Sequence, residues 1–167
     1  MQTFFNEYTF EDIAANLDKK RLQKQLLEGR QILKRLLIPG GGWGNHPAVL
    51  QWKTYEVALV SYCHVIAEEC SARGVKTETN LEVIRQLEEE FLSEKPMVLP
   101  SWWIDGVQRN RLIVTHRARL FVKNPVFYAK YEPFVELAEP YKCCVKCNYF
   151  WPSHHARNSL QPQKIAV

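Results

Sequence analysis

The stretch that decides the fold is Lys19–Leu37, which reads KKRLQKQLLEGRQILKRLL. An apolar stripe runs along it at helical spacings and comprises Leu22, Leu26, Leu33 and Leu36. Polar side chains recur beside the stripe, namely Arg21, Lys24, Gln25 and Glu28. This pattern predicts an α-helix that packs one face against a core and presents polar groups on the neighbouring face. The helix must end by Ile38, because Pro39 and a run of glycines follow.

Helical periodicity marks four further segments. The first is a short helix capped by Thr9 and Asp12, and the second is a long helix that begins at Asn45, has an apolar stripe as far as Cys70 and stops at Gly74. The third begins at Thr79 and Glu82, and the fourth extends over residues 106–123. Residues 95–103 lack usable periodicity, so we expect an ordered loop there, and a short aromatic helix or turn over 124–131. No segment alternates as strands do, and the sequence therefore predicts an all-α fold.

Length and composition predict one compact domain with its own core. The chain has 167 residues, of which 46% are apolar. We expect a helical domain over residues 1–131 and a Pro-, Tyr- and Cys-rich tail over 132–167 that packs on it. No apolar run reaches the ~18 residues that a membrane span needs, and the first ten residues do not read as a signal peptide. We therefore expect a monomer that is not secreted and is located in the cytoplasm, or in the nucleus of a eukaryote.

Charge is distributed unevenly along the chain. The formal net charge is only +4, yet residues 19–37 carry a net +6 and residues 105–131 a net +5. Residues 78–94 reverse the sign, with six glutamates and one arginine. This polarity favours a polyanionic partner, and nucleic acid is the first candidate. The alternative is a helical protein with ordinary solvated charged faces.

Basic and aromatic side chains together are typical of nucleic-acid recognition. The candidate phosphate and base contacts are Arg21, Lys24, Asn45, His46, Arg109, His116, Arg117 and Arg119. The candidate base-stacking rings are Trp43, Trp102, Trp103 and Tyr128. For the two adjacent tryptophans two other interpretations stay open, namely that they fill the core or that they bind a protein partner.

Glu28 is the lone acid within residues 19–37, one helical turn beyond Lys24. A carboxylate held by cations stays ionised, and it can accept a proton, orient a water molecule or stabilise a developing sugar cation. Glu28 is therefore a candidate catalytic residue. The alternative is an ordinary intrahelical ion pair, worth about 0.2–0.5 kcal/mol.

The tail carries a cysteine and histidine cluster. Cys144 and Cys147 have the C-x-x-C spacing, and His154 and His155 follow within about ten residues. Thiolates and imidazoles at such spacings can bind structural zinc, although the second pair lacks the usual separation. Reduced thiols are the alternative. We expect no cofactor to be required for activity.

The order of motifs along the chain resembles the phage endonuclease V type of pyrimidine-dimer DNA glycosylase, and more closely its bacterial branch that begins Met-Gln-Thr-Phe. The segments that carry the resemblance are residues 1–4 (MQTF), 17–25 (LDKKRLQKQ), 45–49 (NHPAV) with Trp52 and Tyr55, 66–70 (IAEEC), 73–74 (RG), 116–120 (HRARL) and 125–131 (PVFYAKY). They extend over most of the chain.

The resemblance implies a compact helical fold in which the amino terminus and the first long helix form the active site. Such enzymes perform base excision on damaged DNA through a free α-amine, which attacks the sugar C1′ and forms a Schiff base. The Schiff base leads to strand cleavage, so these enzymes have endonuclease and AP-lyase activity. An α-amine is a suitable nucleophile, because its reference pKa of about 8 lies well below that of lysine. Met1 is the candidate nucleophile here, and base flipping would require stacking surfaces.

Two positions depart from the family pattern. The family's catalytic glutamate aligns with Gln25, which cannot act as a general base, and the small second residue that normally becomes the amino terminus is replaced by Gln2. Either Glu28 takes over and the Met1 amine is retained, or this branch performs different chemistry. The alternative function is a non-catalytic nucleic-acid-binding module, or a related enzyme acting on RNA or nucleotides.

Overall fold

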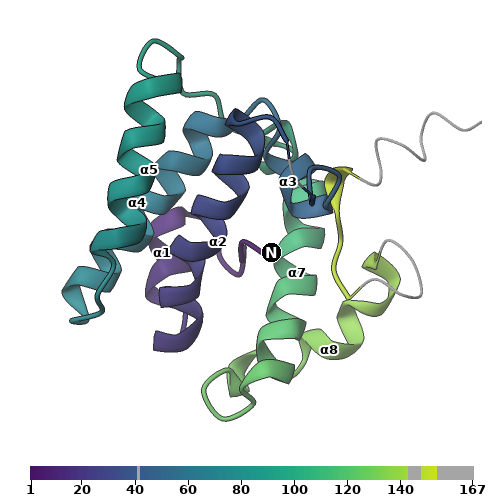
Figure 1. Ribbon diagram of the computed structural model, residues 1–167. Helices are drawn as coiled ribbons and strands as arrows, with labels where there is room; N and C mark the ends of the chain where they lie inside the picture. Colours follow the sequence, from purple (N-terminus) through teal and green to yellow (C-terminus); the bar gives the residue numbers. More distant parts are fainter. Residues whose placement is uncertain (41, 143–147, 154–167) are drawn as a thin grey trace, which may run out of the picture.

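The computed structural model describes residues 1–40, 42–142 and 148–153, and within them the protein is all-α (Figure 1). The helices are α1 (Phe10–Ala15), α2 (Lys19–Leu37), α3 (Pro47–Trp52), α4 (Glu56–Ala72), α5 (Glu78–Phe91), α6 (Ser101–Ile104), α7 (Gly106–Lys123) and α8 (Phe134–Leu137), with 3-10 turns η1 (Ala129–Tyr131) and η2 (Glu139–Tyr141). The predicted fold class is confirmed. None of these helices is long and apolar enough to cross a membrane.

Side chains at the helix ends explain several boundaries. Asp18 caps α2 by accepting the backbone N–H of Arg21 at 2.8 Å, and the helix ends at Leu37 as predicted. The Thr9 hydroxyl accepts the backbone N–H of Asp12 at 3.0 Å, so the predicted cap of α1 is confirmed. Gly74 has a positive φ of 63° directly after α4, the backbone conformation for which glycine was expected there.

The long helix predicted from Asn45 to Cys70 is wrong as one element. It is divided into α3 and α4 by a turn in which Thr54 has a φ of 73°, an unusual conformation for a β-branched residue. The Thr54 backbone N–H donates to Glu56 Oε1 at 3.1 Å, which supports the turn. The cap of α3 is His46 rather than Asn45, since its Nδ1 accepts the Ala48 backbone N–H at 3.1 Å.

Two other boundaries also differ from the expectation. The cap position of α5 is Thr77, so the helix begins at Glu78, before the predicted start at Thr79. Residues 95–103 are not entirely a loop, because Ser101–Ile104 form α6 and bury both tryptophans. The Trp102 indole N–H donates to the Gln51 carbonyl at 2.9 Å, which satisfies its polar atom inside the core.

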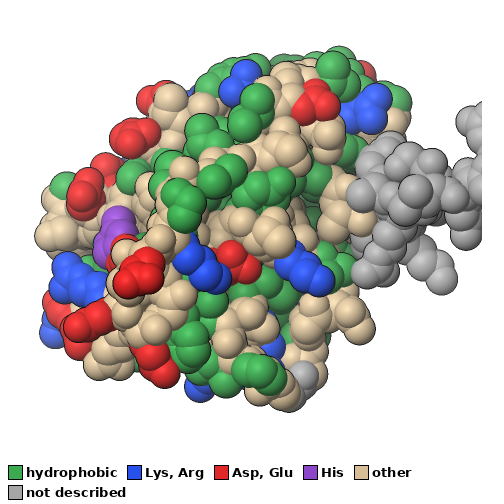
Figure 2. Space-filling model, turned by 90° about the horizontal axis from the view of Figure 1, so that it is seen from above, with side chains coloured by type: hydrophobic (Ala, Val, Ile, Leu, Met, Phe, Trp, Pro, Cys, Tyr) green, Lys and Arg blue, Asp and Glu red, His purple; other side chains and the backbone are tan. Residues whose placement is uncertain are grey.

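The core lies where α2 packs on α4 and α5, and where α7 and the amino-terminal segment close it from the other side (Figure 1). Phe5, Trp52, Trp102 and Trp103 form an aromatic cluster within it. Phe150 and Trp151 of the tail are buried in the same core. The acidic side chains gather at the left of Figure 2, the side on which α4 and α5 lie in Figure 1, away from the amino terminus.

Candidate active site

The amino-terminal segment is held between α2 and α7 by hydrogen bonds to buried side chains (Figure 1). The Phe4 backbone N–H donates to Gln25 Oε1 at 2.9 Å, and the Phe5 N–H donates to His116 Nδ1 at 2.8 Å. The Thr3 hydroxyl accepts the Trp52 indole N–H at 3.0 Å. Side chains of helices α2, α3 and α7 thus anchor this segment, and together they place the first residues of the chain.

Gln25 is 1% exposed and uses both ends of its amide. Its Oε1 also accepts the Tyr62 hydroxyl at 2.8 Å, while its Nε2 donates to the Gln2 carbonyl at 3.4 Å. A glutamate at this position would lack the donor and would add a buried charge. The geometry therefore favours a role for Gln25 in positioning the amino terminus, rather than in proton transfer.

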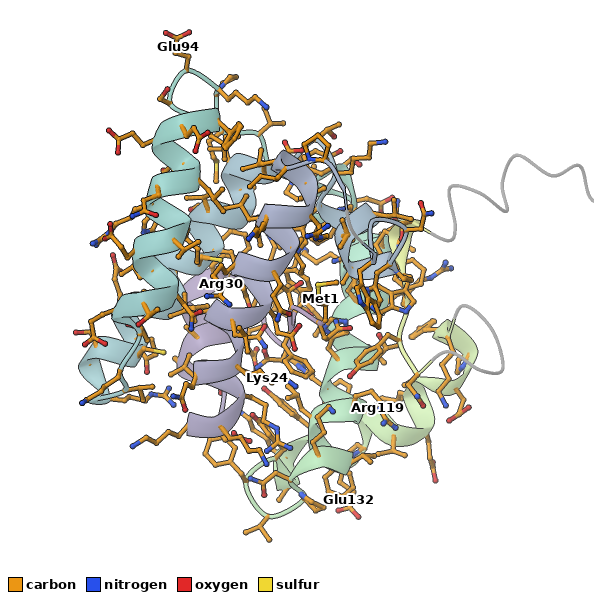
Figure 3. The ribbon with its side chains drawn as sticks, viewed as in Figure 1. Met1, Lys24, Arg30, Glu94, Arg119 and Glu132 are labelled. Carbon is orange, nitrogen blue, oxygen red and sulfur yellow. The ribbon has the colours of Figure 1, made fainter. Side chains whose placement is uncertain are left out.

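Glu28 is the carboxylate that faces the amino terminus. It is 6% exposed, and its Oε2 lies 3.5 Å from the Met1 amine and accepts the Gln2 backbone N–H at 3.0 Å. Its Oε1 lies 3.5 Å from the Lys24 ammonium. Figure 3 shows Met1 between the two helices α2 and α7, which carry Lys24 and Arg119. Two positively charged groups and one backbone donor thus surround the Glu28 carboxylate, which lies within reach of a primary amine.

A cavity of about 260 Å³ opens beside this pair. Its lining residues are Gln2, Phe4, Lys20, Arg21, Lys24, Gln25, Glu28, Lys123 and Tyr149. Four of them are cations, against one carboxylate. The pKa of Lys123 is lowered, first by desolvation and then by the charges of Arg119, Arg21 and Lys24. Such crowding of positive charge is relieved when an anion such as phosphate binds.

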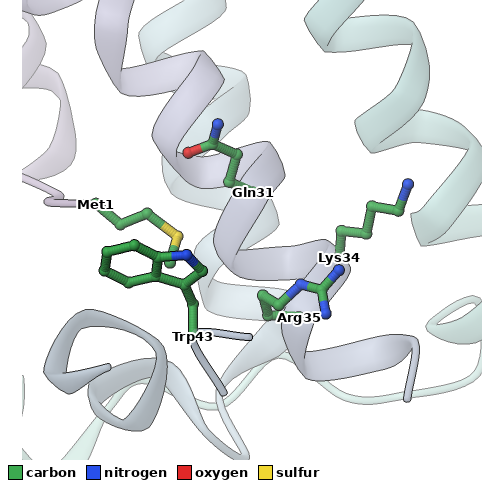
Figure 4. Close-up of a pocket in the computed structure, with 5 residues that line it drawn as sticks. All are labelled: Met1, Gln31, Lys34, Arg35 and Trp43. Carbon is green, nitrogen blue, oxygen red and sulfur yellow. The ribbon is translucent and has the colours of Figure 1, made fainter. Parts of the chain in front are cut away.

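A second cavity of about 410 Å³ lies on the other side of Met1. Figure 4 shows its lining residues, Met1, Gln31, Lys34, Arg35 and Trp43. The Arg35 guanidinium donates to the Gly40 carbonyl at the start of the glycine-rich loop. Because Met1 lines this cavity and its amine contacts Glu28 of the first one, the amino terminus separates the two.

His46 is electrostatically coupled to the amino terminus. Its pKa is lowered by burial and by the positive charge of the terminal amine, while Glu28 acts in the opposite direction. Its Nδ1 accepts the Ala48 N–H, which leaves Nε2 to carry the proton of the neutral ring. The neutral His46 ring thus interacts electrostatically with both the amine and the carboxylate.

Arg21 and Arg119 also lie at this site. The Arg21 guanidinium donates to Asp18 at 3.1 Å and to the Lys123 carbonyl at 2.9 Å, so it links α2 to the end of α7 while it lines the first cavity. Arg119 hydrogen-bonds Tyr149, whose pKa is raised mainly by burial. With Met1, Lys24, Gln25, Glu28 and His46, these two arginines are the predicted residues that the fold brings together.

The other predicted basic contacts lie elsewhere or are engaged in the fold. Arg117 donates to the Asn6 carbonyl and to Glu7, each at 2.7 Å. Arg109 lies over the rings of Tyr8 and Trp103. His116 is buried, and desolvation lowers its pKa to about 3. Asn45 is exposed in the turn before α3.

The predicted stacking rings differ in their exposure to solvent. Trp102, Trp103 and Tyr128 are buried, and the Tyr128 hydroxyl accepts the Asp18 backbone N–H at 2.8 Å. Their faces are covered by protein, which favours the interpretation of the tryptophans as core residues. Trp43 is 68% exposed and lines the second cavity.

Sequence reasoning missed Tyr149, Lys123 and Gln31 as residues of these cavities. The sequence pattern could have identified two of them, because Lys123 lies within a basic segment and Gln31 falls on the helix face that carries Lys24 and Glu28. Tyr149 had no such signal, because only the return of the tail onto α7 brings it to the site. The candidate zinc residues Cys144, Cys147, His154 and His155 lie outside the described residues, so that prediction stays untested.

Comparison with known families adds to this geometry. Residues 1–83 match the family model described as pyrimidine dimer DNA glycosylase. This segment of the chain belongs to the pyrimidine dimer DNA glycosylase family. The glycosylase-family segment includes the amino terminus and helices α1 to α4, whereas Arg119, Lys123 and Tyr149 lie beyond it. Searches among curated proteins and among solved structures find no match to the chain.

Proposed function

We propose that this protein is a DNA glycosylase with AP-lyase activity that acts on damaged or modified duplex DNA. The observation that carries the proposal is the Met1 amine, 3.5 Å from the buried Glu28 carboxylate, with a cation-lined cavity beside it. The family match of residues 1–83 supports the same substrate class.

In the proposed reaction the unprotonated Met1 amine attacks the sugar C1′, and the glycosidic bond breaks with its electron pair leaving on the base. Glu28 accepts a proton from the attacking nitrogen and stabilises positive charge at C1′. The ring oxygen then leaves C1′ and takes back the proton from Glu28, while the departed base takes a proton from water. A protonated imine is left between Met1 and the opened sugar. Loss of a C2′ proton eliminates the 3′ phosphate and cleaves the strand. The cations Lys20, Lys24 and Lys123 would hold the phosphates during these steps.

The chemistry requires a free amine on Met1. A bulky Gln2 favours this state, because aminopeptidases remove the initiator methionine mainly before small residues. Mass spectrometry of the intact protein should therefore give a mass that includes an unmodified Met1. A chain with Met1 acetylated, or preceded by further residues, would contradict the proposed mechanism.

The decisive assay is borohydride trapping. Wild-type protein should form a covalent adduct with a duplex that contains an abasic site or an excised base, since borohydride reduces the imine to a stable amine. Glu28→Gln should bind the duplex normally and lower the trapping rate by about 10²–10⁴-fold, the range for removal of a general base. Glu90→Gln, an exposed glutamate on α5, is the matched control and should behave as wild type.

The competing function is binding of nucleic acid without catalysis. The occupation of the family's glutamate position by Gln25 favours it, because that amide is bound to backbone atoms on both sides. Salt-dependent binding of duplex DNA with no adduct and no base release over a panel of damaged duplexes would establish this alternative and reject the glycosylase.

A further inference from the structure

The described part of the tail returns to the candidate active site and is fixed there. Residues 148–153 lie along α7 and reach α3 (Figure 1). The Phe150 backbone N–H donates to the Thr115 hydroxyl at 3.1 Å, and the Ser153 hydroxyl donates to the Pro47 carbonyl at 3.4 Å. This segment lies outside the part of the chain that matches the glycosylase family, so its contribution to the site does not follow from that match.

Tyr149 is the side chain that this segment places in the first cavity. It lines the cavity of about 260 Å³ together with Glu28, the carboxylate that contacts the Met1 amine. Its ring packs edge-on to His116 and Trp151, with ring centroids 5.1 and 5.7 Å apart. These ring contacts fix the position of the hydroxyl, whereas the lysines of the same cavity have long flexible side chains. Tyr149 is therefore a preorganised polar group at the site.

The Tyr149 hydroxyl has a donor partner and a charged neighbour. Arg119 hydrogen-bonds it, and because a guanidinium can only donate, the hydroxyl oxygen is the acceptor. The hydroxyl thus keeps its own proton to donate to a ligand. Burial is the main cause that raises the pKa of Tyr149, and the charge of Glu28 acts in the same direction, so the hydroxyl stays neutral at physiological pH. A neutral donor polarised by an arginine suits an anionic oxygen.

In the proposed reaction such an oxygen develops after the imine has formed. Glu28 accepts the C2′ proton, the electron pair of the C2′–H bond forms the C2′=C3′ double bond, and the C3′–O bond breaks with its electron pair on the phosphate oxygen. C3′ is two carbons from the C1′ atom that is bonded to Met1, so the leaving oxygen lies close to the amine and to Glu28. Imine formation itself places no additional charge on this phosphate.

We propose that the Tyr149 hydroxyl, held by Arg119, donates a hydrogen bond to the phosphate that leaves C3′ during strand cleavage. The proposal rests on the proposed function and assigns a catalytic residue from the tail to its last step. The hydrogen bond strengthens as negative charge accumulates on the leaving oxygen. Tyr149 therefore accelerates strand cleavage and does not accelerate imine formation.

The test measures both steps in single turnovers on a duplex with one abasic site, by borohydride trapping for the imine and by fragment length for cleavage. Tyr149→Phe keeps the aromatic ring and removes only the hydroxyl. It should trap at the wild-type rate but cleave more slowly by about 10- to 150-fold, the effect of losing one hydrogen bond to a charged group. With sulfur in place of the bridging 3′ oxygen, which makes a better leaving group, this difference should become smaller.

Tyr141→Phe is the matched control, because the Arg111 guanidinium lies 5.9 Å from the Tyr141 ring centroid and this tyrosine does not line the first cavity. It should trap and cleave as wild type does. Equal losses of trapping and cleavage in Tyr149→Phe, or an unchanged difference on the sulfur substrate, would overturn the proposal. Normal trapping and cleavage by Tyr149→Phe reject the role of Tyr149 alone, whereas a wild type that traps no adduct rejects the proposed function and this role with it.

Discussion

His116 is a buried residue that does not line the first cavity itself but contacts Gln2 and Tyr149, which do. Its Nδ1 accepts the Phe5 backbone N–H, so the neutral ring carries its proton on Nε2. Complete burial lowers its pKa to about 3, well below the usual value near 6.5. The imidazole is thus a neutral acceptor that anchors the amino-terminal segment at neutral pH, and the prediction that it contacts DNA has no support from its position.

The pKa of His116 predicts how the fold responds to acid. The unfolded chain binds a proton on this ring near pH 6.5, but the folded protein does so only near pH 3, so protons favour the unfolded state in between. The free energy of unfolding should fall as pH decreases through this window, by about 2–3 kcal/mol between pH 7 and pH 4.5 from this group. Urea denaturation at the two pH values measures the change.

His116→Gln should remove this component of the acid sensitivity. The glutamine amide oxygen can still accept the Phe5 N–H, and it does not titrate. The variant should be less stable than wild type at pH 7 by about 1–2 kcal/mol, since packing is disturbed, but should lose less stability on acidification. His64→Gln, at the surface beside Glu88, is the control. An acid response in His116→Gln equal to that of wild type would contradict the assignment.

At the scale of elements, the close approach of α2 and α4 positions the site. A Cβ added at Gly29 would lie 2.3 Å from Cys63 Sγ and 3.9 Å from Leu59 Cδ1. Glycine at this point of α2 lets the two helices pack closely, with Glu28 on the adjoining face directed to the amino terminus. Cys63 is a buried free thiol whose pKa is raised to about 12 by desolvation, so it behaves as a small apolar residue.

Gly29→Ala should therefore destabilise the protein by about 1–3 kcal/mol, the range for overpacking, despite the higher helix propensity of alanine. In a Cys63→Ala background the sulfur is absent, and the same substitution should become neutral or stabilising. Thermal or urea unfolding of the two single variants and the double variant gives the coupling energy. Additive effects of the two substitutions would show that the Gly29–Cys63 contact does not determine the spacing.

At the scale of the whole molecule, the charges are separated by helix. The basic face of α2 from Lys20 to Arg35 extends about 22 Å at 1.5 Å per residue. This face of α2 carries few acidic side chains, whereas the glutamates of α5 occupy the side seen at the left of Figure 2. Duplex DNA presents about six phosphates per strand over that length, so one face of α2 matches the backbone of a short segment.

This arrangement predicts the salt dependence of binding. Lys34→Ala should lower the affinity for duplex DNA and reduce the slope of log K against log salt by about 0.9, the value for one phosphate contact. Lys76→Ala, an exposed lysine between α4 and α5, should leave the slope unchanged. Fluorescence anisotropy over a range of salt concentrations measures both slopes. Equal slopes for the two variants would place the interface off this face of α2.

The sequence by itself determined the helical class, the limits of α2 and α7, the caps at Thr9 and Gly74, and the segregation of charge. These features follow from local periodicity and end chemistry, which act within a few residues. It also identified Glu28 as the unusual acid of α2, because one carboxylate among seven basic residues is visible without a fold.

Only the tertiary structure decided which side chains meet. Glu56 interrupts the apolar stripe, but one interruption did not indicate a break at Thr54. The burial of Trp102 and Trp103 depends on partners that are distant in sequence. The role of Gln25 in positioning the amino terminus also depends on tertiary contacts, because its amide binds backbone atoms of Phe4 and Gln2. A side chain's chemistry is set by its own atoms, but its task is set by the groups that burial brings within hydrogen-bonding distance.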